Sequence, residues 1–180
     1  MELSGSCHCG EVRFTVYSPT PYPYQACYCS ICRKTAGGGG YAINLGADFA
    51  TMEVEGQENV RSFHARVQNP EDEEARESPA SRHFCGLCGT ALWVYDPRWP
   101  ELVHPFASAI DTPLPDPPEM VRVMLEFAAA WCEVPEGEGE RHYGRYPEES
   151  LEEWHRRHGL YDEARGEATR SPDVRLPGHP

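Results

Sequence analysis

Lysine is almost absent from this chain of 180 residues: all but one of its sixteen basic residues are arginine, and 29 acidic residues leave a net charge of −13. A surface this acidic repels nucleic acids and anionic membranes, so neither is expected as a partner. The sequence also lacks an apolar run of the roughly 20 residues that a membrane span requires. Residues 1–6 have neither the basic nor the apolar region of a secretory signal peptide. These absences predict a cytoplasmic protein.

Cysteine, in contrast, is plentiful and clustered. Seven of the eight cysteines lie in three short groups, which are Cys7-His8-Cys9, the C-x-C-x-x-C segment 27–32 and Cys85-Gly86-Leu87-Cys88. In a reducing cytoplasm such clusters bind metal more often than they form disulfides. Disulfides remain the alternative interpretation, although the two thiols of a C-x-C pair are poor partners for each other.

The number of thiols in these groups suggests two zinc ions. Structural zinc sites are closed by four ligands, whereas catalytic sites usually offer three and keep one position open. The symmetric division of seven thiols joins the two pairs into a closed site and leaves the triple as an open one, although the spacing alone does not force this pairing. The closed site would contain Cys7, Cys9, Cys85 and Cys88, and the open, catalytic site would contain Cys27, Cys29 and Cys32.

Hydrophobic alternation and turn residues predict an all-β fold. In segment 11–17, Val12, Phe14 and Val16 alternate with polar residues, which is the pattern of a half-buried strand. The acidic segment 69–79 is expected to be a solvated loop. Further strands are predicted at 24–27, 41–45, 51–54, 60–67, 91–95, 102–110 and, as the last strand, 120–127. We expect these strands to form one metal-stapled domain over residues 1–132.

The C-terminal part of the sequence has a different character. Ser150 and Glu153 form a capping-box pattern, which predicts a short helix at 151–158 that docks on the body through Leu151 and Trp154. We therefore interpret residues 133–162 as an extension that carries this helix. Residues 163–180 are polar and are expected to form a flexible tail.

Several residues near the three-thiol segment are candidate binding groups. Arg33 and Lys34 follow the last thiol directly and would meet the carboxylates of an anionic ligand, although plain surface exposure is the alternative. Gly38 and Gly39 belong to a run of four glycines whose N–H groups would be free to approach a ligand. A flexible turn is the alternative for this run, which lacks the G-K-[ST] ending of a phosphate loop.

The cysteine segments resemble the glutathione-dependent formaldehyde-activating enzyme family, whose domain also occurs in centromere protein V. The matching pieces are Gly5-Ser6-Cys7-His8-Cys9-Gly10-Glu11-Val12-Arg13-Phe14, Cys27-Tyr28-Cys29-Ser30-Ile31-Cys32-Arg33-Lys34 and Phe84-Cys85-Gly86-Leu87-Cys88-Gly89-Thr90. The resemblance implies a β-tent of antiparallel sheets, a structural zinc on the four paired thiols and a catalytic zinc on the triple. It also implies carbon–sulfur lyase chemistry, or its reverse, on thiol adducts of aldehydes. One departure is Tyr28, where many relatives have a histidine, and this change is expected to affect access to the site.

The open site suggests activation of a thiol such as glutathione rather than of a carbonyl. Three thiolates and Zn²⁺ leave a formal charge of about −1, which makes a poor Lewis acid. Candidate proton shuttles are His8, His64, His83 and His104, and Cys132 is expected to be a buried small hydrophobe.

Two other functions compete with the enzyme. A fourth ligand such as His83 would favour a non-enzymatic zinc module for protein contacts, and reversible thiol oxidation would favour a redox or metal sensor. The sequence does not indicate the oligomeric state.

Overall fold

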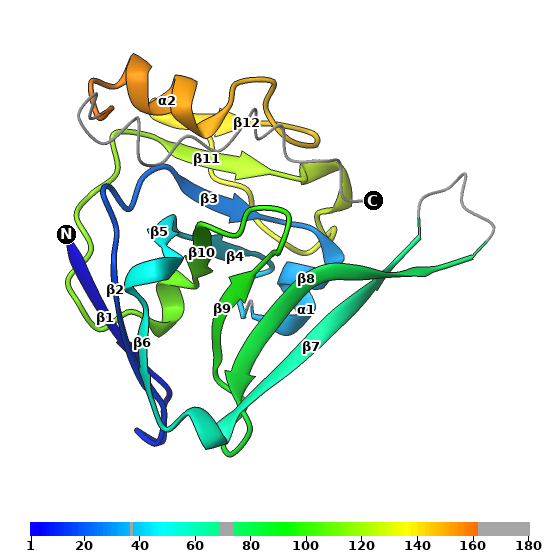
Figure 1. The fold of residues 1–180 in the computed structure, drawn as a ribbon. Coiled ribbons are helices and arrows are strands. Elements are labelled where there is room, and N and C mark those ends of the chain that lie inside the picture. The colour runs from blue at the N-terminus through cyan, green and yellow to red at the C-terminus, as the bar shows by residue number, and fades with distance from the viewer. Residues whose placement is uncertain (37, 69–73, 162–180) are drawn as a thin grey trace.

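A computed structural model describes residues 1–36, 38–68 and 74–161, which form three β-sheets and two α-helices (Figure 1). Two of the sheets, the one with β1 and β2 and the one with β8 and β9, converge toward one end of the molecule, where the β1–β2 turn and the β8–β9 turn lie close together (Figure 1). The all-β expectation is therefore confirmed. Neither α-helix in the described part of the chain is long and apolar enough to span a bilayer.

The first sheet contains β1 (Glu2–Ser6), β2 (Arg13–Tyr17) and β6 (Glu53–Glu55), all antiparallel. The predicted alternation in β2 is confirmed, since Val12, Phe14 and Val16 are buried. Gly5 lies against the Phe14 ring, and a Cβ at this position would approach the Ala109 carbonyl oxygen to 2.6 Å. Only glycine therefore allows β1 to pack this closely against its neighbours.

The second sheet is antiparallel and has the order β5-β10-β9-β8-β7. Its strands are β5 (Ala47–Asp48), β7 (Val60–Val67), β8 (Arg76–Cys85), β9 (Ala91–Tyr95) and β10 (Leu102–Pro105). Strand β8 begins inside the segment predicted as a loop, because cross-strand pairing with β7 continues to Arg76, while residues 69–73 lie outside the described part. Strand β10 ends at Pro105, and the predicted strand 102–110 is wrong beyond this residue, since Ala107–Ala109 form a 3₁₀ turn.

The third sheet corrects the expectation of purely antiparallel sheets. Its order is β12-β11-β3-β4, from β3 (Tyr24–Cys27), β4 (Ala42–Asn44), β11 (Met120–Val123) and β12 (Glu140–His142). Strand β11 pairs in parallel with both β3 and β12, because long connections on either side let the chain return in the same direction. The prediction of a last strand at 120–127 is also wrong, since β11 ends at Val123, before the left-handed Met124, and β12 follows.

Two helices complete the fold. Helix α1 (Ser30–Thr35) was not expected from the sequence, because the thiol of Cys29 takes the N-cap position that serine or aspartate usually occupies. Helix α2 (Leu151–Arg157) confirms the predicted helix and its capping box between Ser150 and Glu153. Four 3₁₀ turns connect other elements, at Phe49–Thr51, Gln57–Asn59, Ala107–Ala109 and Leu125–Phe127.

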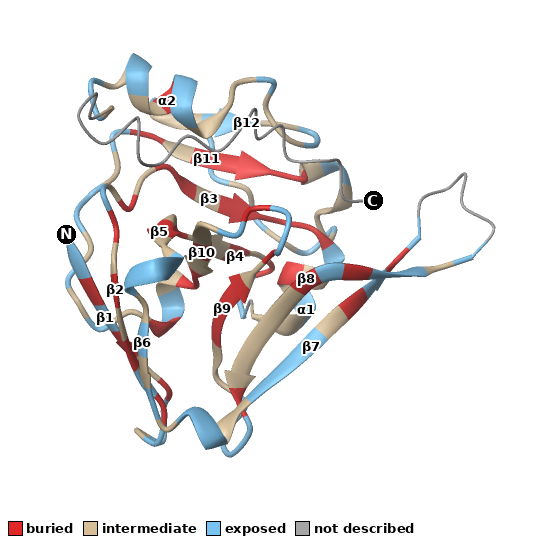
Figure 2. Cartoon of the chain, in the orientation of Figure 1, coloured by how far each residue is buried: buried red, intermediate tan, exposed pale blue. Residues whose placement is uncertain are grey.

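The buried side chains form two clusters (Figure 2). One lies between the first and second sheets and includes Leu3, Phe14 and Trp93. The other contains the three thiols of segment 27–32 together with residues of β9 and β11. Residues of the C-terminal extension pack on this second cluster, so the extension covers the part of the core that holds the three-thiol segment.

Candidate active site and metal centres

Four thiols meet where the turns after β1 and β8 converge. The Sγ atoms of Cys7, Cys9, Cys85 and Cys88 lie within 4.8 Å of one another, with 3.4 Å between Cys7 and Cys9 and 3.8 Å between Cys9 and Cys85. Tetrahedral zinc with Zn–S bonds of about 2.3 Å separates its sulfurs by about 3.8 Å, so this four-thiol cluster has a suitable size. Cys7 and Cys85 are buried, whereas Cys9 and Cys88 are exposed.

Local backbone geometry points these thiols inward. Gly10 and Gly89 follow the last thiol of each pair with φ values of 80° and 77°, a conformation that glycine adopts without strain. The Val12 amide donates to the Cys7 sulfur at 3.2 Å, and the Thr90 hydroxyl lies 3.2 Å from the Cys88 sulfur. The hydrogen bond with Thr90 lowers the pKa of Cys88 to about 5. These contacts stabilise the thiolate form that metal binding needs.

The other three thiols of the predicted ligand set lie at the end of β3 and the start of α1. Cys27 ends the strand, Cys29 caps the helix and accepts the Cys32 amide at 3.3 Å, and Cys32 lies in the first turn. Each residue is 4% exposed, and the three Sγ atoms lie within 4.8 Å of one another. Among the described residues, no fourth cysteine, histidine or carboxylate belongs to this three-thiol cluster.

Electrostatics show that this cluster needs a cation to hold three thiolates. The hydrogen bond between Cys27 and Cys29 lowers the pKa of Cys29 and raises that of Cys27 well above its ordinary value. The buried thiols thus share their protons, and one ionises at the expense of another. A divalent ion would remove this competition by stabilising all three thiolates, so the donor set fits a soft metal ion.

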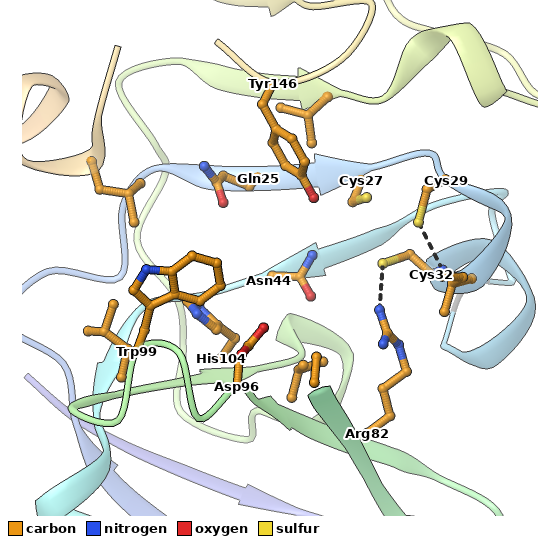
Figure 3. Close-up of a pocket in the computed structure, with 16 residues that line it drawn as sticks. Gln25, Cys27, Cys29, Cys32, Asn44, Arg82, Asp96, Trp99, His104 and Tyr146 are labelled. Carbon is orange, nitrogen blue, oxygen red and sulfur yellow. Dashed lines mark hydrogen bonds between the residues drawn. The ribbon is translucent and has the colours of Figure 1, made fainter. Parts of the chain in front are cut away.

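A pocket of about 90 Å³ opens onto all three thiols of this cluster (Figure 3). Its walls come from the second and third sheets, α1 and the C-terminal extension, and most of them are apolar. The lining residues are Gln25, Cys27, Cys29, Ile31, Cys32, Asn44, Ala80, Arg82, Val94, Asp96, Trp99, Leu102, His104, Val123, Tyr146 and Leu151.

Arg82 is the arginine that lines this pocket, and the sequence interpretation missed it. Its Nη2 atom donates to the Cys32 sulfur at 3.8 Å, and its buried Nε atom has no hydrogen-bond partner among the described residues. A cation in this place offsets the negative charge of the thiolates. The sequence does contain one indication of this role. Arg82 lies three residues before Cys85 on a half-buried strand, and a charged side chain in such a place usually has an oppositely charged or hydrogen-bonding partner nearby.

Two polar rings also reach this pocket. The Nδ1 atom of His104 carries the ring proton and donates it to the Leu45 carbonyl at 3.1 Å. Burial lowers the pKa of His104, so the ring is neutral with Nε2 as acceptor. Tyr146 directs its hydroxyl toward the interior of the pocket (Figure 3). Burial raises the pKa of Tyr146 well above its ordinary value, which keeps the phenol protonated. Tyr146 begins segment 146–155, which resembles a common tail of bacterial members of the family named above, but that resemblance did not indicate a side chain in the pocket.

The predicted binding residues Arg33, Lys34, Gly38 and Gly39 do not line this pocket. Arg33 and Lys34 lie on the last turn of α1, and Lys34 is exposed, as are both glycines. Their proposed contacts with an anionic ligand therefore lie outside this pocket and stay a prediction.

Other residues singled out in the sequence lie away from the pocket. Tyr28 is fully buried on the opposite side of β3, where its hydroxyl accepts from Arg122 at 2.8 Å, so it does not control access to the pocket. His83 stacks on Trp93 and does not join the three thiols. Of the four candidate shuttle histidines, only His104 lines the pocket. Cys132 is half-buried rather than buried, because its thiol donates to the Gly39 carbonyl near the surface.

Fold and site together define a β-sheet protein with one closed and one open cysteine cluster, the open one at the base of a pocket. Comparison with known proteins identifies the family. Residues 2–126 match the family described as "Glutathione-dependent formaldehyde-activating enzyme", and the chain belongs to it. A Halomonas elongata protein named "Putative glutathione-dependent formaldehyde-activating enzyme" is 58% identical over 160 residues, which cover 89% of this chain and 98% of the relative. A crystal structure of a Rhodobacter sphaeroides protein aligns with a TM-score of 0.47 and 25% identity, over 64% of this chain and 92% of that one.

Proposed function

We propose that this protein is a zinc-dependent enzyme that joins a thiol such as glutathione to an aldehyde such as formaldehyde, or catalyses the reverse carbon–sulfur lyase reaction. The four-thiol cluster would hold a structural zinc and the three-thiol cluster a catalytic zinc. The family and the name of the Halomonas relative support the substrates. We further propose that the protein works in the cytoplasm, where glutathione is abundant and the eight free cysteines stay reduced.

The single observation that carries this proposal is the pocket above the three-thiol cluster. All three thiols line it, and no fourth ligand group from the described residues closes the cluster. Cys27, Cys29 and Cys32 would hold a zinc ion with three ligands, and such an ion would supply the positive charge that lowers the pKa of an incoming thiol. The non-enzymatic zinc module that was the alternative requires a filled fourth position.

The reaction needs no oxidant or reductant. The sulfur of the thiol forms a bond to the aldehyde carbon, the carbonyl π electrons move to the oxygen, and the proton from the thiol ends on that oxygen to give an S-hydroxymethyl product. The residues of this chain would bind and orient the two reactants in a largely apolar pocket, which limits competing hydration of the aldehyde. Arg82 would stabilise the thiolate-rich cluster through its contact with Cys32.

Exchange spectroscopy at equilibrium is the direct test, because glutathione and formaldehyde also react without a catalyst. Magnetisation transfer between free and bound formaldehyde measures turnover of the adduct without perturbing the equilibrium. Wild type should exceed the uncatalysed rate, while Cys29→Ser, which keeps an N-cap for α1, should match the blank. Cys132→Ser serves as the matched control, since this cysteine lies outside both clusters.

Two results together would contradict the enzyme. The first is a wild-type rate equal to the blank across several aldehydes and thiols. The second is an unchanged absorption spectrum of cobalt-substituted protein on addition of glutathione. A zinc module for protein contacts would then be the better interpretation, and reversible loss of one metal on thiol oxidation would instead favour a sensor.

A further inference from the structure

The C-terminal extension contributes directly to the pocket, although the family match ends at residue 126. Tyr146 and Leu151 are lining residues, and Tyr146 packs against the cluster that contains the three thiols. The chain after residue 126 is therefore part of the wall around the open metal centre rather than an appendage.

The backbone on the N-terminal side of Tyr146 is fixed by hydrogen bonds to β11 and to the residues that follow it. These bonds continue the parallel pairing of β11 with β12. They join Tyr143 N to Arg122 O at 2.9 Å, Met124 N to Arg145 O at 2.9 Å and Glu126 N to Gly144 O at 3.0 Å. Three consecutive residues before Tyr146 are thus tied to β11, which also supplies Val123 to the pocket, and to the residues that follow this strand.

A second anchor holds the chain on the C-terminal side of Tyr146. Glu119 is 5% exposed and accepts hydrogen bonds from Trp154 at 2.8 Å and from Arg157 at 2.9 Å, which fastens α2 to the start of β11. His155 also contacts the Tyr22 carbonyl at 2.7 Å. Tyr146 is therefore held between two anchored segments, the kind of support that a group with a defined position in a reaction requires.

The side chain of Tyr146 extends from this segment into the pocket. Figure 3 shows its hydroxyl in the same space as the amide groups of Gln25 and Asn44, on the side of the pocket where Cys27 lies. A phenol in this position donates a hydrogen bond to an oxygen in the pocket. In a thiol–aldehyde adduct, the oxygen is separated from the sulfur by a single carbon, so it must lie close to the three-thiol cluster.

We infer that Tyr146 is a catalytic residue whose hydroxyl donates a hydrogen bond to the aldehyde oxygen and stabilises the negative charge that develops there as the carbon–sulfur bond forms. Tyr146 keeps its own proton, and the proton lost by the thiol ends on the product hydroxyl. The inference rests on the proposed function for the identity of the reactants. Fixed donors of this kind act on developing charge because they need no reorganisation during the reaction.

Binding of two small thiols to the cobalt-substituted protein tests the contact without any turnover. The probes 2-mercaptoethanol and 1-propanethiol have the same length, and only the first carries a hydroxyl near its sulfur. Tyr146→Phe should reduce the preference for 2-mercaptoethanol over 1-propanethiol about five- to tenfold relative to wild type, the loss expected for one neutral hydrogen bond. Tyr143→Phe, the same change three residues away and outside the pocket lining, should leave the preference unchanged.

Turnover by exchange spectroscopy then tests the catalytic role. Tyr146→Phe should lower kcat about 10- to 100-fold with little change in the KM for glutathione, while metal content and melting temperature stay at wild-type values. An unchanged probe preference or an unchanged kcat in Tyr146→Phe, beside an active wild type and an inactive Cys29→Ser, would overturn the inference and leave the proposed function standing. Failure of both probe thiols to alter the cobalt spectrum of wild type, together with a wild-type exchange rate equal to the blank, would overturn both.

Discussion

The two cysteine clusters differ in how their ligands are distributed along the chain. The four-thiol cluster joins turns from two different sheets, and Cys9 and Cys85 are 76 residues apart in sequence. The three-thiol cluster comes from a single segment of six residues at the junction of β3 and α1. The first has two exposed thiols at one end of the molecule, whereas the second is buried beneath a pocket.

Because of this difference, we expect the four-thiol cluster to contribute to the stability of the fold and the three-thiol cluster to the reaction. A metal ion that links distant segments closes a long loop, so its binding free energy becomes folding free energy. A metal ion held by one short segment adds little to the chain's connectivity, and its ligands are already positioned by β3 and α1. The short segment can therefore offer an incomplete ligand set without loss of the fold, which is the condition for an open coordination position.

Loss of one thiol from each cluster gives the largest expected contrast. Cys85→Ser should leave the domain unfolded at room temperature, because structural zinc contributes on the order of 10 kcal/mol, about the whole stability of a domain. Cys29→Ser should fold and lose at most about 2 kcal/mol, since serine preserves the cap of α1. Thermal melts by circular dichroism measure both, and equal large losses in the two variants would mean that the three-thiol cluster is structural as well.

The number of thiols and their symmetric division suggested the two groups that the structure brings together, although the spacing did not force this pairing. Only the three-thiol group is local in the sequence, since the four-thiol group joins Cys9 to Cys85 across 76 residues. Strands such as β2, β3 and β9 were predictable from alternation and flanking turn residues. The capping box of α2 is equally local, and both of its hydrogen bonds are formed.

The walls of the pocket were not predictable in the same way. Arg82, Asn44, Trp99 and Tyr146 come from four separate segments, and no local pattern relates them. Arg82 lies on β8, Trp99 lies between β9 and β10, and Asn44 lies on β4. Tyr146 follows residues that are hydrogen-bonded to the end of β11, and the parallel pairing of β11 with β3 is a long-range contact that no local pattern indicates. Helix α1 was missed for a different reason, since a thiol at its N-cap replaces the usual signal.

Graded metal removal compares the two clusters within one molecule. Purified protein should contain close to two zinc ions per chain, and titration with a chelator at equilibrium should remove them in two steps. The three-thiol cluster should release its metal first, because it has one protein ligand fewer, even though its thiols are more buried than Cys9 and Cys88. Far-ultraviolet circular dichroism should change only in the second step.

Elemental analysis and a thiol-reactive dye follow this titration together. The first step should release three reactive thiols and the second step four. Protein that never holds more than one metal ion, or a first step that exposes four thiols, would contradict the assignment of the closed and open clusters.

Glu119→Gln should loosen the attachment of α2, which contributes to the pocket above the three-thiol cluster, and should leave the four-thiol cluster unchanged. Burial alone would raise the pKa of Glu119, but hydrogen bonds from Arg157, Arg141 and Trp154 outweigh it and lower the pKa to about 2 from an ordinary value of 4.5. We expect a loss of about 2–3 kcal/mol at neutral pH, together with faster hydrogen exchange in α2. Glu152→Gln, which removes an exposed pair with Arg156 on the same helix, should cost less than about 1 kcal/mol.

The pH dependence has a definite sign. Because the folded state lowers the pKa of Glu119, its contribution is complete above about pH 5 and disappears as the pH falls from 4.5 toward 2. The stability difference between wild type and Glu119→Gln should therefore be constant at higher pH and shrink in this acidic range. Protonation of the thiols affects both proteins equally and cancels in the difference. A difference that grows on acidification would contradict the role of Glu119 in anchoring α2.

A smaller effect than that of Glu119→Gln is expected for Tyr28, which lies between two thiols of the three-thiol cluster but does not line the pocket. Its hydroxyl accepts from Arg122, which also donates to Glu140 at 2.6 and 2.9 Å, so Tyr28→Phe removes one of three contacts of this buried arginine. We expect a loss of about 1 kcal/mol in thermal or urea unfolding. Adduct turnover and the cobalt spectrum should stay at wild-type values, because the phenol hydroxyl bonds to Arg122 and Tyr28 does not line the pocket. A severalfold change in turnover at unchanged stability would mean that the residue between the first two thiols controls the substrate after all.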